Sequence, residues 1–277
     1  MATNSKLLSF EFFPPKTETG KDKLIHLAHQ LKEYNPEYFS VTYGAGGSTR
    51  EGTIDVCKTL IDDIKVDACA HISGIGSHKE DIKQLLNVYR KIGVNRLVVL
   101  RGDLPSGFGG VGDFPYAVNL IEFIRKETGS LFNIEVAAYP EVHPQAISKT
   151  QDLDNFADKV KAGANGAITQ FFFQDKVYVD FIEECLKRNI SIPIVPGIMP
   201  IHDLDALVRM ANGCGAKIPG DFLKKLSMMK NQEDLLKLST EIMTSLCEKL
   251  YSYGAPSIHF YTINRLEPTT TIIKSMR

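Results

Sequence analysis

Short apolar, β-branched runs alternate with longer amphipathic runs through most of this chain, and that alternation limits the possible folds more than any other feature. The short runs are typical of buried strands, and the longer runs are typical of helices with one apolar face. A strand–helix repeat predicts parallel strands joined by right-handed crossovers. Eight such units favour an α/β fold of the closed (β/α)8 TIM-barrel type. We expect residues 1–277 to form one such domain.

An open, doubly wound sheet is the structural rival to the barrel. That fold usually carries a glycine-rich dinucleotide turn after its first strand. Here Pro14 and Pro15 stand at that place, which favours the barrel.

The expected elements follow from the pattern. The predicted strands are Leu7–Phe13, Tyr38–Tyr43, Val66–His71, Arg96–Leu100, Ile134–Tyr139, Gly166–Phe171, Ile192–Val195 and Ile258–Thr262. Apolar helix faces are predicted at Leu24, Leu27, Ala28 and Leu31, at Ile82, Leu85, Leu86 and Tyr89, and at Leu153, Phe156, Ala157 and Val160. We expect Ser77 to cap the second of these helices and Asp152 to open the third. Residues 211–231 predict a loop and a short extra helix before a long last helix, Glu233–Tyr251.

Composition excludes several classes of function. The net charge of -1 and the lack of a basic tail argue against nucleic-acid binding. The five scattered cysteines form no Cys-x-x-Cys pair, which predicts reduced thiols in a cytoplasmic protein and no zinc site. No run has the length and apolarity of a signal peptide or membrane span, so we expect neither.

Glu11 stands in the first apolar strand, which two prolines end. Strand alternation places Phe10 and Phe12 on one face and Ser9 and Glu11 on the other. A charged carboxylate is costly to bury among aromatic rings, so such a group resists ionisation, finds a cation or works as a general acid. An edge strand with Glu11 facing water is equally compatible with the pattern, and both interpretations stay open.

Active sites of (β/α)8 barrels lie at the carboxyl ends of the strands. Polar residues follow almost every predicted strand at that end: Thr42 and Tyr43 before the glycine-rich loop Gly44-Ala45-Gly46-Gly47, His71, Arg101-Gly102-Asp103, Tyr139-Pro140-Glu141-Val142-His143, Thr169-Gln170 and Tyr261-Thr262-Ile263-Asn264-Arg265. Each also has a structural interpretation. The loop can be an ordinary turn, His71 a core histidine, Arg101 and Asp103 an ion pair, and Asp103 a helix cap. Their concentration at one end favours a site there.

The residue types at this end argue against three common chemistries. No lysine lies inside a strand, which weakens a Schiff-base aldolase. No spacing suits a metal-dependent hydrolase, and no Gly-x-Ser-x-Gly elbow is present. One acid among aromatic, amide and basic groups suits a planar, anionic, electron-accepting ligand better.

Six motifs converge on one family: Ser9-Phe10-Glu11-Phe12-Phe13-Pro14-Pro15-Lys16, Val41-Thr42-Tyr43-Gly44-Ala45, Leu100-Arg101-Gly102-Asp103, Ala137 to Pro144, Ala167 to Phe173 and Phe260 to Arg265. Over essentially its whole length the chain resembles the bacterial type of 5,10-methylenetetrahydrofolate reductase, reduced to the catalytic barrel. The resemblance implies an FAD-binding barrel that takes electrons from NADH or NADPH in a ping-pong reaction. It also implies reduction of methylenetetrahydrofolate to 5-methyltetrahydrofolate, which feeds methionine synthesis.

The resemblance further implies roles for individual residues. Glu11 is the expected general acid, which opens the folate imidazolidine ring, and Asp103 lies near both flavin and pterin. Gln170, Tyr261 and Arg265 are expected to bind the folate. The expected FAD site comprises Thr42, Tyr43, His71, Arg101, Gly102, Asp103, Tyr116, Tyr139, His143, Asp152, Asn155 and Lys159. Asp158 and Met210 depart from the family pattern, where a basic and an aromatic residue can stand.

Two alternatives stay open. One is a flavoprotein subunit that needs an iron–sulfur partner, and the other is a non-redox barrel lyase or ligand-binding protein. By resemblance we expect a homo-oligomer, whereas the choice between NADH and NADPH is not predicted.

Overall fold

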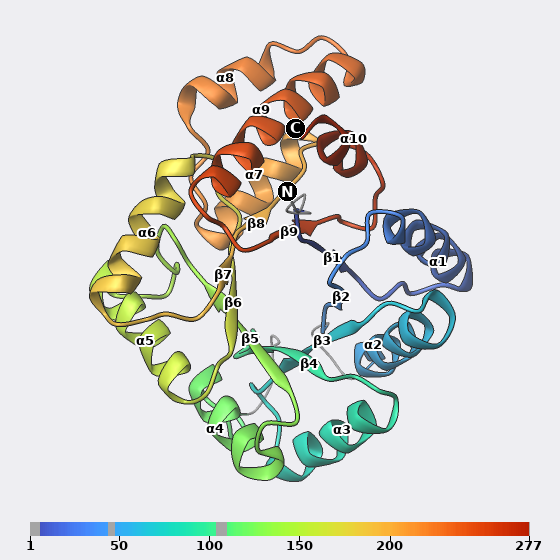
Figure 1. Cartoon of the computed structure of the whole chain (residues 1–277), viewed down its shortest axis with the longest axis vertical. Helices are drawn as coiled ribbons and strands as arrows, with labels where there is room; N and C mark the ends of the chain where they lie inside the picture. The colour runs from blue at the N-terminus through green and yellow to red at the C-terminus, as the bar shows by residue number, and fades with distance from the viewer. Residues whose placement is uncertain (1–5, 44–47, 104–109, 277) are drawn as a thin grey trace, which may run out of the picture.

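The computed structural model describes residues 6–43, 48–103 and 110–276 as a nearly closed barrel of parallel strands with helices around it (Figure 1). The strands are β1 (Leu8–Phe12), β2 (Tyr38–Val41), β3 (Ala68–Ser73), β4 (Arg96–Leu100), β5 (Asn133–Ala138), β6 (Gly166–Thr169), β7 (Ile194–Val195), β8 (Gly197–Ile198) and β9 (Ile258–Tyr261). They pair in the order β7-β6-β5-β4-β3-β2-β1-β9-β8, so the predicted barrel is confirmed.

Helices alternate with the strands as far as β7, and three helices lie between β8 and β9. The described helices are α1 (Glu18–Lys32), α2 (Ser48–Thr59) with the π-helical turn η1 (Leu60–Ile64), α3 (Lys79–Lys91), α4 (Ala117–Thr128), α5 (Lys149–Lys161), α6 (Asp175–Lys187), α7 (Leu204–Cys214), α8 (Gly220–Ser227), α9 (Gln232–Ser252) and α10 (Thr269–Ser275). The predicted extra helix is α8, which Figure 1 shows beside α9 and outside the ring of strands.

The seventh predicted strand, Ile192–Val195, is observed as the shorter β7, and a further strand that was not predicted, β8, follows Pro196. β7 pairs with β6, and β8 pairs with β9. Proline has no backbone N–H, so it interrupts the ladder. Its carbonyl oxygen still accepts a hydrogen bond from the His259 N–H at 3.0 Å, which helps to join the two halves of the wall.

Two predicted helix starts are wrong. The residue before α3 is His78 rather than Ser77, and the His78 N–H donates to Asp81 Oδ2 at 3.3 Å. α5 begins three residues before Asp152, at Lys149, because the Ser148 side chain accepts the Gln151 N–H. The helix α7 also continues to Cys214, into the stretch predicted to be a loop.

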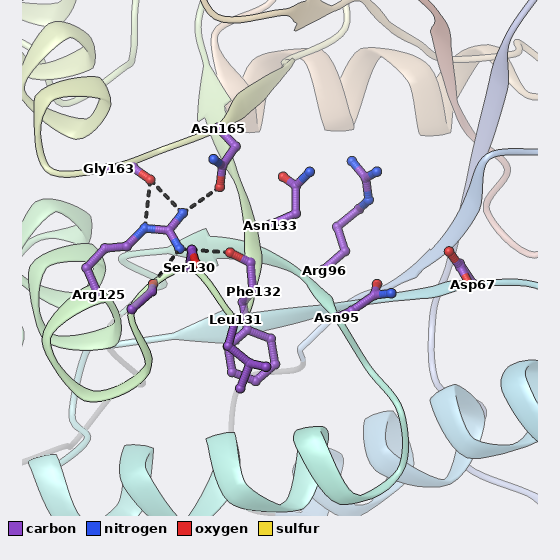
Figure 2. Close-up of a pocket in the computed structure, with 11 residues that line it drawn as sticks. Asp67, Asn95, Arg96, Arg125, Ser130, Leu131, Phe132, Asn133, Gly163 and Asn165 are labelled. Atoms are coloured by element: carbon purple, nitrogen blue, oxygen red, sulfur yellow. Dashed lines mark hydrogen bonds between the residues drawn. The ribbon is translucent and has the colours of Figure 1, made fainter.

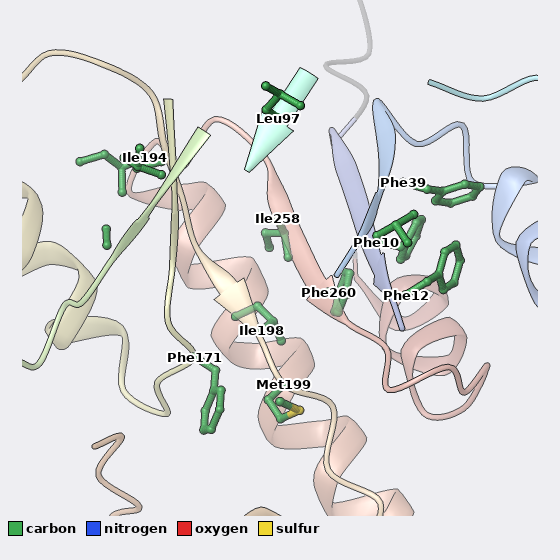
Figure 3. Close-up of a cluster of buried hydrophobic side chains, with 14 of the residues drawn as sticks. Phe10, Phe12, Phe39, Leu97, Phe171, Ile194, Ile198, Met199, Ile258 and Phe260 are labelled. Atoms are coloured by element: carbon green, nitrogen blue, oxygen red, sulfur yellow. The ribbon is translucent and has the colours of Figure 1, made fainter. Parts of the chain in front are cut away.

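Strand alternation divides the buried side chains into an outer and an inner group. Phe10, Phe12 and Phe39 pack together on the helix side of β1 and β2 (Figure 3), with ring centroids 5.0–5.9 Å apart for the Phe12–Phe39 and Phe10–Phe39 pairs. Inside the barrel a smaller cluster forms from Tyr38, Cys69, Val98 and Ile168. Ser9 and Glu11 share the inner face, as the alternation predicts.

Candidate active site

Glu11 lies inside the barrel near the carboxyl ends of the strands. Its strand β1 is paired on both sides, with β2 and β9, and the residue is 8 % exposed. The interpretation as a solvent-facing edge residue is therefore wrong. Glu11 Oε2 lies 3.4 Å from His71 Nε2 and 3.8 Å from His259 Nε2.

His71, at the end of β3, is a neutral neighbour of this carboxyl group. Burial lowers the pKa of His71 to about 4, although the charge of Glu11 opposes that shift. A neutral imidazole cannot hold Glu11 in a permanent ion pair. Among the described residues, the buried His71 Nε2 makes no hydrogen bond, and Glu11 Oε2 lies 3.4 Å from it.

His259 is a buried site neighbour that the sequence analysis missed. Its Nδ1 lies 2.7 Å from Ser9 Oγ, and its Nε2 lies 3.4 Å from Ser40 Oγ. The residue sits in the middle of β9 and not at its end, so a search of strand ends passed over it. The alternation of Ile258-His259-Phe260-Tyr261 is the signal that places His259 and Tyr261 on the inner face.

Tyr261 and Thr262 attach the end of β9 to its neighbours. Tyr261 Oη donates to the Thr169 carbonyl at 2.7 Å, and Thr262 Oγ1 donates to the Glu11 carbonyl at 2.6 Å. Gly197 makes room for the tyrosine, since a Cβ there would lie 2.5 Å from Tyr261 Cε2. The exposed Arg265 follows. Burial lowers the pKa of His202, and the charge of Arg265 lowers it further.

Just after β4 the backbone at Gly102 packs closely against Ser73. Gly102 has a φ of 82°, and a Cβ there would lie only 1.9 Å from Ser73 Oγ, so glycine is required. Ser73 Oγ donates to the Arg101 carbonyl at 2.9 Å. Asp103 is exposed and does not cap α4, whose N-cap is Tyr116.

Charged groups from the segment after β4 and from α5 meet around His143, which follows β5. Burial lowers the pKa of His143, Asp152 opposes this, and the charges of Arg101 and Lys159 add to it. The His143 N–H donates to Asp152 Oδ2 at 2.8 Å, and the His143 ring packs edge-on against Tyr139 at 4.4 Å.

Lys159 is a partly buried cation in this group. Its Nζ donates to the Ala137 carbonyl at 2.5 Å, and burial lowers its pKa to about 8, against the charge of Asp152. Tyr139 lies between this group and Gln170. Burial raises the pKa of Tyr139, a side-chain hydrogen bond with Gln170 lowers it, and the charges of Asp103 and Asp152 raise it.

The remaining predicted residues lie nearer the edge of this region. The Thr42 N–H donates to the Phe12 carbonyl, and Tyr43 is partly buried beside it. Asn155 on α5 is exposed, as is the Tyr116 ring. The glycine-rich loop Gly44–Gly47 lies outside the described residues. Of the two departures from the family pattern, Asp158 pairs with Lys161 at 3.3 Å and Met210 packs against the core.

The opposite end of the barrel has a hollow of about 590 Å³, but its main cation is already bonded (Figure 2). Arg125 donates to the carbonyls of Gly129, Phe132 and Gly163 and to Asn165 Oδ1. These bonds use the donors of its guanidinium group, so we read this floor as structural and place the candidate site at the other end.

Comparison with known proteins shows which family the chain belongs to. The family model for methylenetetrahydrofolate reductase matches residues 1–277. The chain belongs to the methylenetetrahydrofolate reductase family. Among relatives in this family, a 5,10-methylenetetrahydrofolate reductase of Pectobacterium carotovorum is 36% identical over 97% of this chain and 89% of its own length. The corresponding Escherichia coli protein is 34% identical over 97% of this chain and 90% of its own length.

A longer plant relative in the methylenetetrahydrofolate reductase family, from Oryza sativa, is described as a probable NADH-dependent enzyme. It is 34% identical over 99% of this chain, which spans only 49% of that protein. A solved structure from Clostridium thermocellum, described as binding two copies of 5-methyl-5,6,7,8-tetrahydrofolic acid, aligns with a TM-score of 0.66. It covers 98% of this chain and 94% of its own at 15% identity, which shows the barrel fold alone.

Two features are absent from the described residues 6–43, 48–103 and 110–276. In that part of the chain, no three His, Cys, Asp or Glu side chains are grouped so as to hold a metal ion. No helix there is both long and apolar enough to cross a bilayer.

Proposed function

We propose that this chain catalyses the FAD-dependent reduction of 5,10-methylenetetrahydrofolate to 5-methyltetrahydrofolate, with NADH or NADPH as electron donor. The observation that carries the proposal is Glu11, a carboxyl group buried at the active end of a barrel of this family. When bound, FAD supplies the hydride carrier between the two substrates. The name of the rice relative supports a nicotinamide donor.

The residues at the carboxyl end of the barrel fit a flavin. Gly102 lets the backbone after β4 pack closely on Ser73, and His71 Nε2, which makes no hydrogen bond within the described residues, offers a polar contact beside Glu11. Arg101 and Lys159 lie together near His143 and suit the anionic part of the cofactor. We therefore assign the FAD site to Thr42, Tyr43, His71, Arg101, Gly102, Asp103, Tyr116, Tyr139, His143, Asp152, Asn155 and Lys159.

Glu11 is the proposed general acid. Its place inside the barrel keeps bulk water away, and His71, held neutral by burial, gives the carboxyl group no positive charge. Glu11 then gives its proton to the ring nitrogen that leaves when the imidazolidine ring of the folate opens. The resulting iminium carbon is the hydride acceptor.

The folate contacts in this proposal come from the neighbouring strand ends. Gln170 and Tyr261 lie beside the inner face. Burial raises the pKa of Tyr261, and the charge of Glu11 raises it further. The exposed Arg265 suits the anionic end of the folate, and Asp103 orients the pterin. Residues 1–277 would act as one catalytic domain of a cytoplasmic homo-oligomer whose product serves methionine synthesis.

The test separates the two half-reactions. Purified protein loaded with FAD is reduced anaerobically by NADH or NADPH while flavin bleaching is followed, and methylenetetrahydrofolate is then added to reoxidise it. Glu11→Gln should keep the first step and lower the rate of the second by roughly 10²–10⁴-fold. Glu122→Gln, exposed on α4, is the matched control.

Three results would contradict the proposal. A protein inert to both nicotinamides would favour the subunit that depends on an iron–sulfur partner. A protein that stays colourless with FAD would favour a non-redox barrel. If Glu11→Gln slowed both half-reactions equally, Glu11 would be structural.

A further inference from the structure

The turn that follows β9 has an unusual backbone. Ile263 and Asn264 both have a φ of 52°, in the left-handed region. Asparagine tolerates that region, whereas a β-branched isoleucine is an outlier there. Such a conformation is strained and persists only where surrounding contacts hold it. The contacts that hold this turn are therefore informative.

Those contacts join the turn to the strand that carries Glu11. Asn264 Oδ1 accepts the Phe13 N–H at 2.9 Å, and Asn264 Nδ2 donates to the Phe13 carbonyl at 2.8 Å. Thr262 Oγ1 donates to the Glu11 carbonyl. The backbone pairing of β1 with β9 ends at Glu11 and Tyr261. Hydrogen bonds from Thr262 and Asn264 thus hold β1 to the turn after β9 beyond the last paired residues.

We propose that Asn264 is a positioning residue that acts through Glu11. Its amide carries both an acceptor oxygen and an N–H donor group, so it holds both polar groups of the Phe13 backbone, two residues after Glu11. The same residue maintains the turn that leads into Arg265, whose N–H donates to the Thr262 carbonyl at 2.9 Å. The Asn264 side chain therefore fixes the position of the Glu11 strand relative to the backbone of Arg265. The inference rests on the proposed function for its effect on the folate step.

Three substitutions separate the amide from the turn. Asn264→Ala removes both bonds to Phe13. Asn264→Gly also removes them but adopts the left-handed conformation freely. Asn264→Asp keeps an acceptor for the Phe13 N–H and loses the donor. The matched control is Asn165→Ala at the barrel floor, because Asn165 Oδ1 likewise accepts a backbone N–H, that of Ile134, at 2.8 Å.

The measurements are the two half-reactions and hydrogen exchange at the Phe13 amide. Asn264→Ala and Asn264→Gly should both slow reoxidation by methylenetetrahydrofolate about 10- to 100-fold, since small displacements of a catalytic group have effects of that size. Flavin reduction by NAD(P)H should match that of Asn165→Ala. Asn264→Asp should recover part of the rate, and the Phe13 amide should exchange faster in the first two variants only.

A normal folate rate in Asn264→Gly would overturn the inference, because the turn alone would then suffice. An equal loss in both half-reactions would also overturn it, since that indicates a general structural role. Wild-type protein that nicotinamide reduces but methylenetetrahydrofolate does not reoxidise would instead refute the proposed function. In that case the exchange of the Phe13 amide still decides whether the contact with Asn264 holds β1.

Discussion

The burial of His71 makes the stability of the barrel depend on pH, and one substitution can isolate this dependence. The unfolded imidazole has a pKa near 6.5, whereas burial lowers the folded value to about 4. Between these values the unfolded chain binds more protons than the folded chain. The free energy of unfolding therefore falls as the pH falls through this window, and this contribution is fully present above it.

The two pKa values give the magnitude. Their separation corresponds to about 3 kcal/mol in total, of which about 2 kcal/mol is lost between pH 7 and pH 4.5. Urea unfolding of the wild type and of His71→Gln at both pH values measures the difference, because glutamine is polar but does not titrate. His26→Gln, exposed on α1, corrects for the loss of a surface histidine.

The result that refutes this reasoning is simple. If the wild type and His71→Gln lost the same free energy of unfolding on acidification, protonation of His71 would not oppose folding. His71 would then not be held neutral beside Glu11, and the proposed environment of the general acid would be wrong.

Two further predictions concern the opposite ends of the barrel. Asp103→Asn should slow reoxidation of the flavin by methylenetetrahydrofolate and change flavin reduction less, as stopped-flow absorbance would record; unchanged kinetics would remove Asp103 from the site. Arg125→Met should lower the free energy of unfolding by about 2–4 kcal/mol in urea titrations, because hydrogen bonds from a charged group are strong but the hollow admits water to the freed carbonyls. The folate rate of that variant should stay normal at temperatures where it is folded, and a loss under about 1 kcal/mol would show that water replaces Arg125.

The barrel itself could be predicted from the sequence because its signal is repeated. The predicted strand at Arg96–Leu100 has the observed bounds, and the predicted last helix differs from α9 by one residue at each end. The errors came where local chemistry competes with periodicity. The predicted strand Ile192–Val195 stops before Pro196 and omits β8 beyond it, and Ser148 starts α5 before the first apolar residue of its face.

The candidate site was predictable only as far as it follows strand ends. Glu11 and His71 lie side by side, as their positions at strand ends imply. Arg101 and Lys159 both lie close enough to His143 for their charges to lower its pKa. His259 escaped notice because its importance arises from register: it pairs with Ser9 across β1 and β9, which are 250 residues apart. A single sequence contains no direct record of such a pairing.

The bonds of Arg125 also bear on the order in which the molecule folds. They join residues only 38 and 40 positions apart, whereas the bond from Thr262 to Glu11 spans 251. Closing the longer loop costs about 1.5 kcal/mol more chain entropy, and non-local pairings form slowly. We therefore expect the segment from α4 to β6 to become ordered early and the junction of β1 with β9 to form late. The proposed acid would then acquire its surroundings only when the last part of the wall is complete.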